Sequence, residues 1–142
     1  MDISREEVIA LRRYYLWANE FRVCFYRCVT AARAQGIKPD ELGRADLAAG
    51  ASSQYLSFWL AALHVVTEGW EDAGLTNVSV GRLLEHTENR KLLKRYRNGV
   101  YHFQRSLTDK RFGDLLSRGQ AIVPWVVELH DEFGRALFPE RK

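Results

Sequence analysis

The fold of this chain is decided by residues 52–73, which read SSQYLSFWLAALHVVTEGWEDA. Large apolar side chains recur in this stretch at steps of three and four residues: Leu56, Trp59, Leu60, Leu63, Val66 and Trp70. Such spacing places them on one broad face of an α-helix, which must then be buried. Because a serine can cap the start and Gly74 follows the end, we expect a core helix from about Ser52 to Ala73.

The same periodicity extends outward on both sides of this stretch. It predicts long helices over about Ser4–Gln35, Glu88–Leu107 and Ile122–Phe138, and short helices over Val80–Glu85 and from Thr108 or Asp109 to Leu116. The alternation of apolar and polar residues that marks strands is absent, and the chain holds only three prolines. We therefore predict an all-α fold, a four- to five-helix bundle that forms a single domain over residues 1–142.

Positive charge is concentrated in one part of the chain. The net charge is only +3, but eight basic residues fall between Arg90 and Arg111, where Asp109 is the only acid. A local field of this kind attracts phosphate groups, and a solvated helix face is the alternative explanation. No apolar run approaches the ~18 residues that cross a membrane, and the N-terminus lacks a signal-peptide pattern. We therefore expect a cytoplasmic protein without a membrane partner.

The predicted helix over residues 88–107 has two distinct faces. On a wheel at 100° per residue, the apolar arc that we expect to face the core holds Leu93, Tyr96, Val100, Phe103 and Leu107. The opposite side holds Lys94, Arg95, Asn98, His102 and Arg105. Arg97 lies on the flank between the two faces. Gly99 costs about 1 kcal/mol relative to alanine inside a helix, so it either permits a close backbone approach or is merely tolerated.

Six residues of this helix, Arg97-Asn98-Gly99-Val100-Tyr101-His102, resemble the signature motif of the HEPN superfamily (higher eukaryotes and prokaryotes nucleotide-binding domain). In that motif an arginine, here followed by a polar residue, is separated from a histidine by four positions. The resemblance implies an up-and-down bundle that dimerises through the motif helices. It also implies, for many members, metal-independent cleavage of RNA without a cofactor. Other members bind a nucleotide or a partner protein without catalysis, and that alternative stays open, as does a plain helical scaffold.

The resemblance further implies a role for each motif residue. His102 would act as general base or acid, because histidine exchanges a proton near neutral pH. Arg97 would hold the phosphate by bidentate contacts, and Asn98 would orient His102 or donate to a phosphate oxygen. The residues expected to contact the RNA backbone or a base are Lys94, Arg95, Tyr101 and Arg105. For Tyr101, packing at the helix flank is the alternative.

The expected partners are RNA, or a nucleotide, and a second copy of the chain. Two motif helices that meet across a two-fold axis would line one basic cleft. Small stand-alone chains of HEPN type often resemble toxins that an antitoxin holds in check. The resemblance therefore implies an antitoxin as a further partner.

Other polar residues give weaker indications. His64 and Glu68 are spaced as two metal ligands on one helix, but two ligands are not a metal site, and none is predicted. His130 stands near Glu128 and Asp131, which indicates a solvated face. Pro124 fits the first turn of the last helix, where its missing N–H has no partner to lose.

Overall fold

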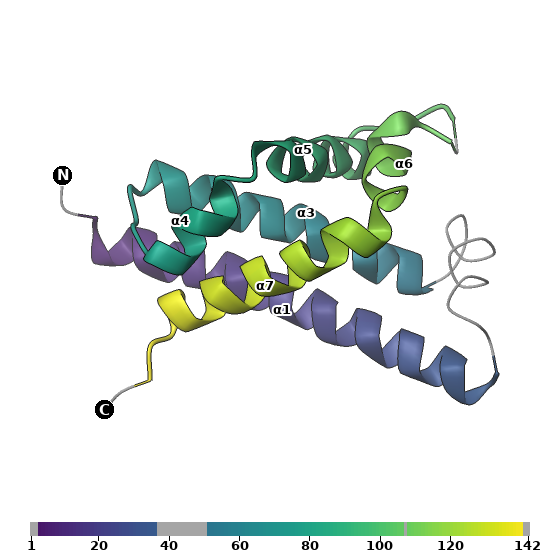
Figure 1. Ribbon diagram of the computed structural model, residues 1–142. Coiled ribbons are helices and arrows are strands. Elements are labelled where there is room, and N and C mark those ends of the chain that lie inside the picture. The colour runs from purple at the N-terminus through teal and green to yellow at the C-terminus, as the bar shows by residue number, and fades with distance from the viewer. Residues whose placement is uncertain (1–2, 37–50, 107, 141–142) are drawn as a thin grey trace.

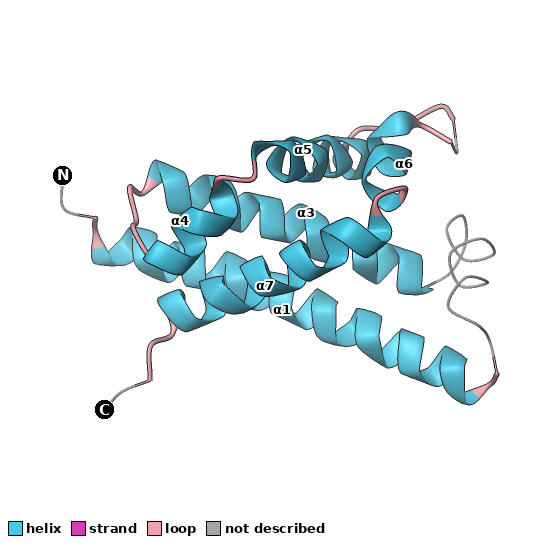
Figure 2. Ribbon diagram, viewed as in Figure 1, coloured by secondary structure: helices cyan, strands magenta, loops and turns pink. Residues whose placement is uncertain are grey.

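The computed structural model describes residues 3–36, 51–106 and 108–140. Within these ranges the chain forms α1 (Arg5–Ala34), α3 (Ala51–Asp72), α4 (Val78–Leu84), α5 (Thr87–Tyr101), α6 (Lys110–Leu116) and α7 (Gly119–Leu137). The described part of the chain contains helices and loops but no strand (Figure 2). The all-α prediction is therefore confirmed. None of these helices is long and apolar enough to cross a membrane.

The two longest helices, α1 and α3, pack against each other and form the base of the bundle (Figure 1). α5 lies on α3, α7 crosses α1, and the short helices α4 and α6 pack against α7. The core between them is built mainly from α3 and α7, where Leu63, Val66, Leu129 and Phe133 are fully buried. The stretch that predicted a core helix therefore lies at the centre of the bundle.

The first helix begins and ends close to where the sequence predicted. Ser4 caps it: the Ser4 hydroxyl accepts from the N–H of Glu7 at 3.1 Å, and the Glu7 carboxylate accepts from the N–H of Ser4 at 2.8 Å. The two hydrogen bonds lower the pKa of Glu7. The helix ends at Ala34 with Gln35 as its C-cap, and Gly36 follows with a φ of +77°, which favours glycine.

The motif helix ends earlier than predicted. α5 stops at Tyr101, and His102 already has an extended backbone with φ −117° and ψ 126°. Phe103, expected in the core, is 92% exposed, while Leu107 lies outside the described residues. The prediction failed because the apolar spacing continues past Tyr101 and no glycine or proline interrupts it. The chain must nevertheless turn back there, since α6 packs onto α5.

The last helix begins three residues before its predicted start. Because α7 starts at Gly119, Pro124 is its sixth residue and lies beyond the first turn, contrary to the prediction. Its ring therefore removes a hydrogen bond that the carbonyl of Gln120 would otherwise accept. The apolar positions from Ile122 onward marked the buried part of the helix, and the exposed first turn carried no such signal.

His130 was predicted on a solvated face, and that prediction is wrong. Its side chain is completely buried between helices. The Trp59 indole N–H donates to Nδ1 of His130 at 3.1 Å, so Nε2 carries the proton and donates to Oδ1 of Asn19 at 3.2 Å. Burial, and secondarily the charge of Arg22, lowers the pKa of His130 to about 3. The imidazole is thus a neutral structural link among α1, α3 and α7.

Candidate functional site

The six motif residues occupy the last turn of α5 and the position just after it. Arg97 to Tyr101 are helical, and the N–H of His102 makes the final helical bond to the carbonyl of Asn98 at 3.0 Å. The His102 side chain is exposed. Its carbonyl accepts from the Gln104 amide at 2.6 Å, which fixes the backbone beyond the helix. The imidazole therefore stands at the open end of α5 on an ordered backbone.

Arg97 is the residue of the motif that the structure holds most firmly. Its side chain is half-buried, and Nη1 donates to Oδ1 of Asn98 at 3.1 Å. The guanidinium also lies over the ring of Tyr101, with 5.8 Å between Cζ and the ring centroid. Nε is buried without a hydrogen-bond partner in the described part of the chain. Asn98 and Tyr101 therefore position the guanidinium, and no carboxylate of the described ranges pairs with it.

Ion pairs remove much of the basic field that the sequence indicated. On α5, Arg90 pairs with Glu71 at 2.5 Å, Lys91 with Glu88 at 3.1 Å, and Arg95 with Asp114 at 2.9 Å. Lys94 and Arg97 are the cations of α5 that have no carboxylate within 4 Å among the described residues. Arg105 is exposed in the loop after the helix. Among the described cations of α5, those without a carboxylate partner thus lie in the second half of the helix.

Gly99 has a packing reason to be glycine. It is buried, and a Cβ at this position would lie 3.1 Å from the Cβ of Arg111 and from the ring of Phe112. The missing side chain therefore lets α6 approach the motif helix closely. Of the two explanations that the sequence left open, the close approach is the one observed.

The structure brings some of the predicted site residues together and leaves others apart. Arg97, Asn98 and Tyr101 form one contact group, and Lys94 lies one turn earlier on the same helix. The side-chain oxygen of Asn98 accepts from Arg97, so Asn98 positions the guanidinium. Within the described residues no hydrogen bond joins the His102 imidazole to Arg97 or to Asn98.

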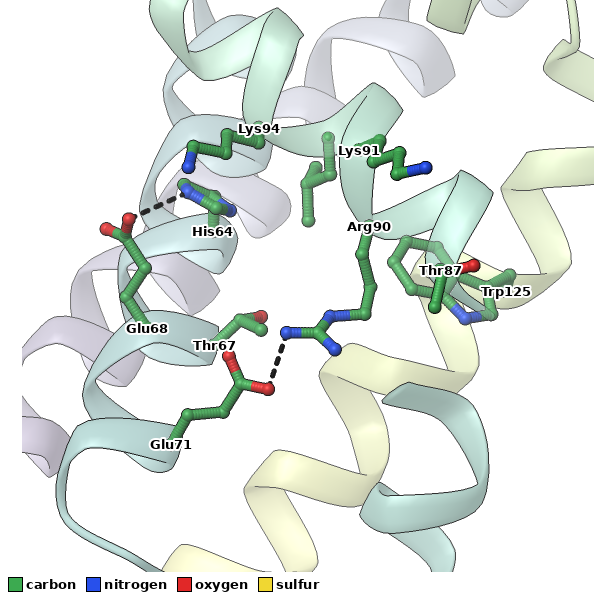
Figure 3. A pocket seen from close by; sticks show the side chains of 10 residues that line it. His64, Thr67, Glu68, Glu71, Thr87, Arg90, Lys91, Lys94 and Trp125 are labelled. Atoms are coloured by element: carbon green, nitrogen blue, oxygen red, sulfur yellow. Dashed lines mark hydrogen bonds and ion pairs between the residues drawn. The ribbon is translucent and has the colours of Figure 1, made fainter. Parts of the chain in front are cut away.

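A pocket of about 320 Å³ lies between α3, the first half of α5 and the start of α7 (Figure 3). It is lined by His64, Thr67, Glu68, Glu71, Thr87, Arg90, Lys91, Leu93, Lys94 and Trp125. The sequence indicated His64 and Glu68 only as an incomplete metal pair, and the described residues hold no group of three metal-ligating side chains. The signal that could have found the pocket is the stripe Arg90, Lys94, Arg97 on α5, at helical spacing.

The pocket and the motif share one electrostatic environment. Burial lowers the pKa of His64, and the positive charges of Arg97 and Lys94 lower it further, although the nearby Glu68 carboxylate opposes them. His64 is therefore neutral at neutral pH.

Comparisons of the chain with models of known protein families, with curated proteins and with solved structures found no match.

Proposed function

We propose that this protein is a metal-independent endoribonuclease of HEPN type, which acts in the cytoplasm through a composite site in a homodimer. The proposal rests on the position and the charge of the Arg97 guanidinium. This group is positioned by two neighbours, has no carboxylate partner among the described residues, and lies one and a half turns before an exposed imidazole. A fixed, unneutralised arginine beside a histidine suits a phosphodiester in which negative charge develops.

The proposed reaction needs only proton transfers and attack by the substrate itself. One imidazole takes the proton of a ribose 2′-hydroxyl, and the 2′-oxygen attacks the adjacent phosphorus. The bond from phosphorus to the 5′-oxygen breaks, and that oxygen receives a proton from an imidazolium. The products are a 2′,3′-cyclic phosphate and a 5′-hydroxyl. In a dimer, His102 of each protomer supplies one of the two proton transfers.

The neighbouring residues have supporting roles in this proposal. Arg97 binds the non-bridging phosphate oxygens, and Asn98 and Tyr101 hold it in place. Lys94 and Arg105 attract the RNA backbone without reading its sequence. Arg95 contributes less than the sequence suggested, because Asp114 already neutralises it.

The test is cleavage of a mixed-sequence RNA in EDTA by the parent chain and by His102→Ala and Arg97→Ala. We expect the parent to cut. His102→Ala should lose about two to four orders of magnitude in rate, the usual contribution of acid–base catalysis, and Arg97→Ala about two to three, the usual contribution of one group that stabilises transition-state charge. Two matched controls should keep the parental rate. His86→Ala removes an exposed histidine at the other end of α5, and Arg33→Ala removes an exposed arginine in the last turn of α1.

Two outcomes contradict the proposal. In one, the folded parent leaves RNA intact, which favours a non-catalytic module that binds a nucleotide or a partner protein. In the other, RNA is cut equally fast by the motif variants, which assigns the activity to other residues or to a contaminant. Circular dichroism of each variant establishes that it is folded.

A further inference from the structure

The side of α1 that points away from the bundle forms a surface of its own. The buried residues of this helix are Leu11, Tyr15 and Ala18, on the side that packs against α3 and α7. On a wheel at 100° per residue, an arc of about 100° on the opposite side holds eight residues. They are Glu6, Ile9, Arg13, Leu16, Trp17, Glu20, Cys24 and Arg27. All are exposed except Cys24, which is half-buried, and we call them the outer face of α1.

Three large apolar side chains lie in this outer face. Ile9 is 53% exposed, Leu16 is 54% exposed and Trp17 is 51% exposed. The indole of Trp17 is held in place, because the ring of Tyr14 meets it edge-on with 5.2 Å between centroids and the guanidinium of Arg13 lies 5.7 Å from its centroid. Tryptophan, tyrosine and arginine carry much of the binding energy in protein interfaces, and a side chain that is already fixed loses little entropy on binding. The outer face therefore has the composition of a contact surface.

The charged residues of the outer face alternate in sign and are unpaired. Glu6, Arg13, Glu20 and Arg27 follow one another at steps of seven residues, which is nearly two helical turns, so the four side chains stand close to one line along the helix. Among the described residues, none of the four has an opposite charge within 4 Å. A line of acid, base, acid and base becomes base, acid, base and acid when it is reversed, so the outer face is complementary to its own reversed copy.

We propose that the outer face of α1 binds the same face of a second copy of the chain, with the two helices antiparallel. The two-fold axis passes between Leu16 and Trp17, so residues whose numbers add up to 33 lie at the same level of the pair. At the centre, Leu16 and Trp17 pack against their own counterparts. Beside them Arg13 meets Glu20 of the second copy, and the symmetry repeats this ion pair.

The same register also matches the two ends of the outer face. Glu6 lies at the level of Arg27 of the second copy, which gives a further pair of opposite charges, again repeated by the symmetry. Ile9 lies at the level of Cys24, so an apolar side chain meets a half-buried thiol. All eight residues of the outer face thus have a suitable counterpart in a single arrangement.

The charges also disfavour the neighbouring registers. If one helix slid by seven residues in one direction, Arg13 would lie opposite its own counterpart and Glu6 opposite Glu20. A slide of seven residues in the other direction would place Glu20 opposite its own counterpart and Arg13 opposite Arg27. Like charges that face each other suppress a wrong arrangement. The outer face therefore specifies the register as well as the partner.

The contact is small and separate from the proposed active site. Each copy contributes eight residues, whereas a standard interface has about 20–30 a side, so we expect a dissociation constant on the order of 0.1–1 mM. At the micromolar concentrations of a cleavage assay the outer faces would stay apart. α1 and α5 lie on opposite sides of α3, so a contact through α1 leaves the motif end of α5 free (Figure 1). The proposal goes beyond RNA cleavage and does not depend on it.

The first test traps the contact through a native thiol, in a Cys28→Ser background at a protein concentration near the expected dissociation constant. Ile9→Cys places a thiol at the level of Cys24 of the second copy. Oxidation with diamide should then give a covalent dimer on a non-reducing gel. Adding Cys24→Ser should abolish it, because the two introduced thiols stand at opposite ends of the pair. Val78→Cys, at an exposed position on α4, is the matched control and should give no such dimer.

The second test reverses charges in a Phe103→Asp background, which removes any contact through the motif end of α5. Sedimentation equilibrium over a range of concentrations gives the dissociation constant of the remaining self-association. Arg13→Glu should weaken it by about tenfold, because two attractive contacts become repulsive. Adding Glu20→Arg to Arg13→Glu should restore it, since the pair is then reversed as a whole. Arg33→Glu, at an exposed position of α1 outside the outer face, should leave it unchanged.

Several results would overturn the antiparallel contact. A parent that stays monomeric in the Phe103→Asp background at millimolar concentration leaves the outer face to a different occupant. A covalent dimer that persists after Cys24→Ser, or that forms equally with Val78→Cys, contradicts the register. So does a double charge reversal that fails to restore association. None of these measurements involves RNA, so this proposal and the nuclease proposal fail separately.

Discussion

At the scale of single residues, His130 makes the stability of the protein dependent on pH. Its pKa lies near 6.5 in an unfolded chain and at about 3 in the folded one, because burial disfavours the charged ring. As the pH falls, His130 therefore takes up a proton in the unfolded chain at a higher pH than in the folded chain. The stabilisation is fully present above pH 6.5 and is lost as the pH falls toward 3, by up to about 1.4 kcal/mol for each pH unit.

Urea unfolding of the parent and of His130→Gln at several pH values between 7.5 and 4.5 measures this effect. His64 adds dependence of the same sign, so the difference between the two proteins isolates the contribution of His130. We expect the variant to be less stable at pH 7.5 and to have a shallower dependence below pH 6.5. His86→Gln, which changes an exposed histidine, should keep the parental slope. An unchanged slope in His130→Gln contradicts the neutral buried ring.

Histidines also show what the sequence could not reveal at this scale. The charged neighbours Glu128 and Asp131 suggested that His130 faces solvent. It nevertheless falls on the inner stripe with Val126, Phe133 and Leu137, at helical spacing. The deciding partner is the indole of Trp59, which lies 71 positions away in sequence. No local sequence pattern predicts a contact between residues so far apart in the chain. For the same reason the sequence could not predict that Lys94 of α5 lies near His64 of α3.

At the scale of helices, the packing of α6 on α5 depends on Gly99. We expect Gly99→Ala to destabilise the protein by about 1–3 kcal/mol, because overpacking against Phe112 outweighs the gain in helix propensity of about 1 kcal/mol. Gly113→Ala is the matched control within α6. A Cβ there meets nothing within 4 Å, so it should stabilise by up to about 1 kcal/mol. Thermal unfolding followed by circular dichroism measures both.

If Gly99→Ala stabilised the protein as much as Gly113→Ala does, the close approach of the two helices would be disproved. RNA cleavage by Gly99→Ala is a second readout, since a shifted α6 would also displace the end of the motif helix.

How well each helix was predicted depended on whether the residues that end it lie close to it in the sequence. α1 was predicted to within one residue at each end, because Ser4, Glu7 and Gly36 encode its caps locally. α5 was extended by six residues, because its end is imposed by the packing of another helix. The six residues from Arg97 to His102 could be singled out from the sequence, since they are contiguous, and their role stays a prediction. The pocket was missed, because its two walls come from α3 and α5.

At the scale of the whole molecule, the proposed nuclease requires two copies of the chain. Phe103 is 92% exposed and Tyr101 is 55% exposed, one on each side of His102, so two aromatic side chains are available for a contact at the motif end of α5. We expect sedimentation velocity to give a species of about twice the 16.4 kDa of one chain. Phe103→Asp should produce the monomer and abolish RNA cleavage, because a charge in a self-complementary contact is placed there twice.

Val78→Asp is the control for this experiment. Val78 is 91% exposed on α4, away from the motif, and its replacement should leave the dimer intact. A parent that sediments as a monomer at the concentrations used for cleavage would remove the basis for a composite site. So would a Phe103→Asp variant that remains dimeric.

The buried imidazole between helices also has an evolutionary consequence. Asn19, Trp59 and His130 come from three separate helices, and each satisfies a polar atom of another. Replacing any one of them strands a donor or an acceptor in the interior. We therefore expect evolution to keep these three residues or to replace them together. Substitutions at the three positions should be correlated.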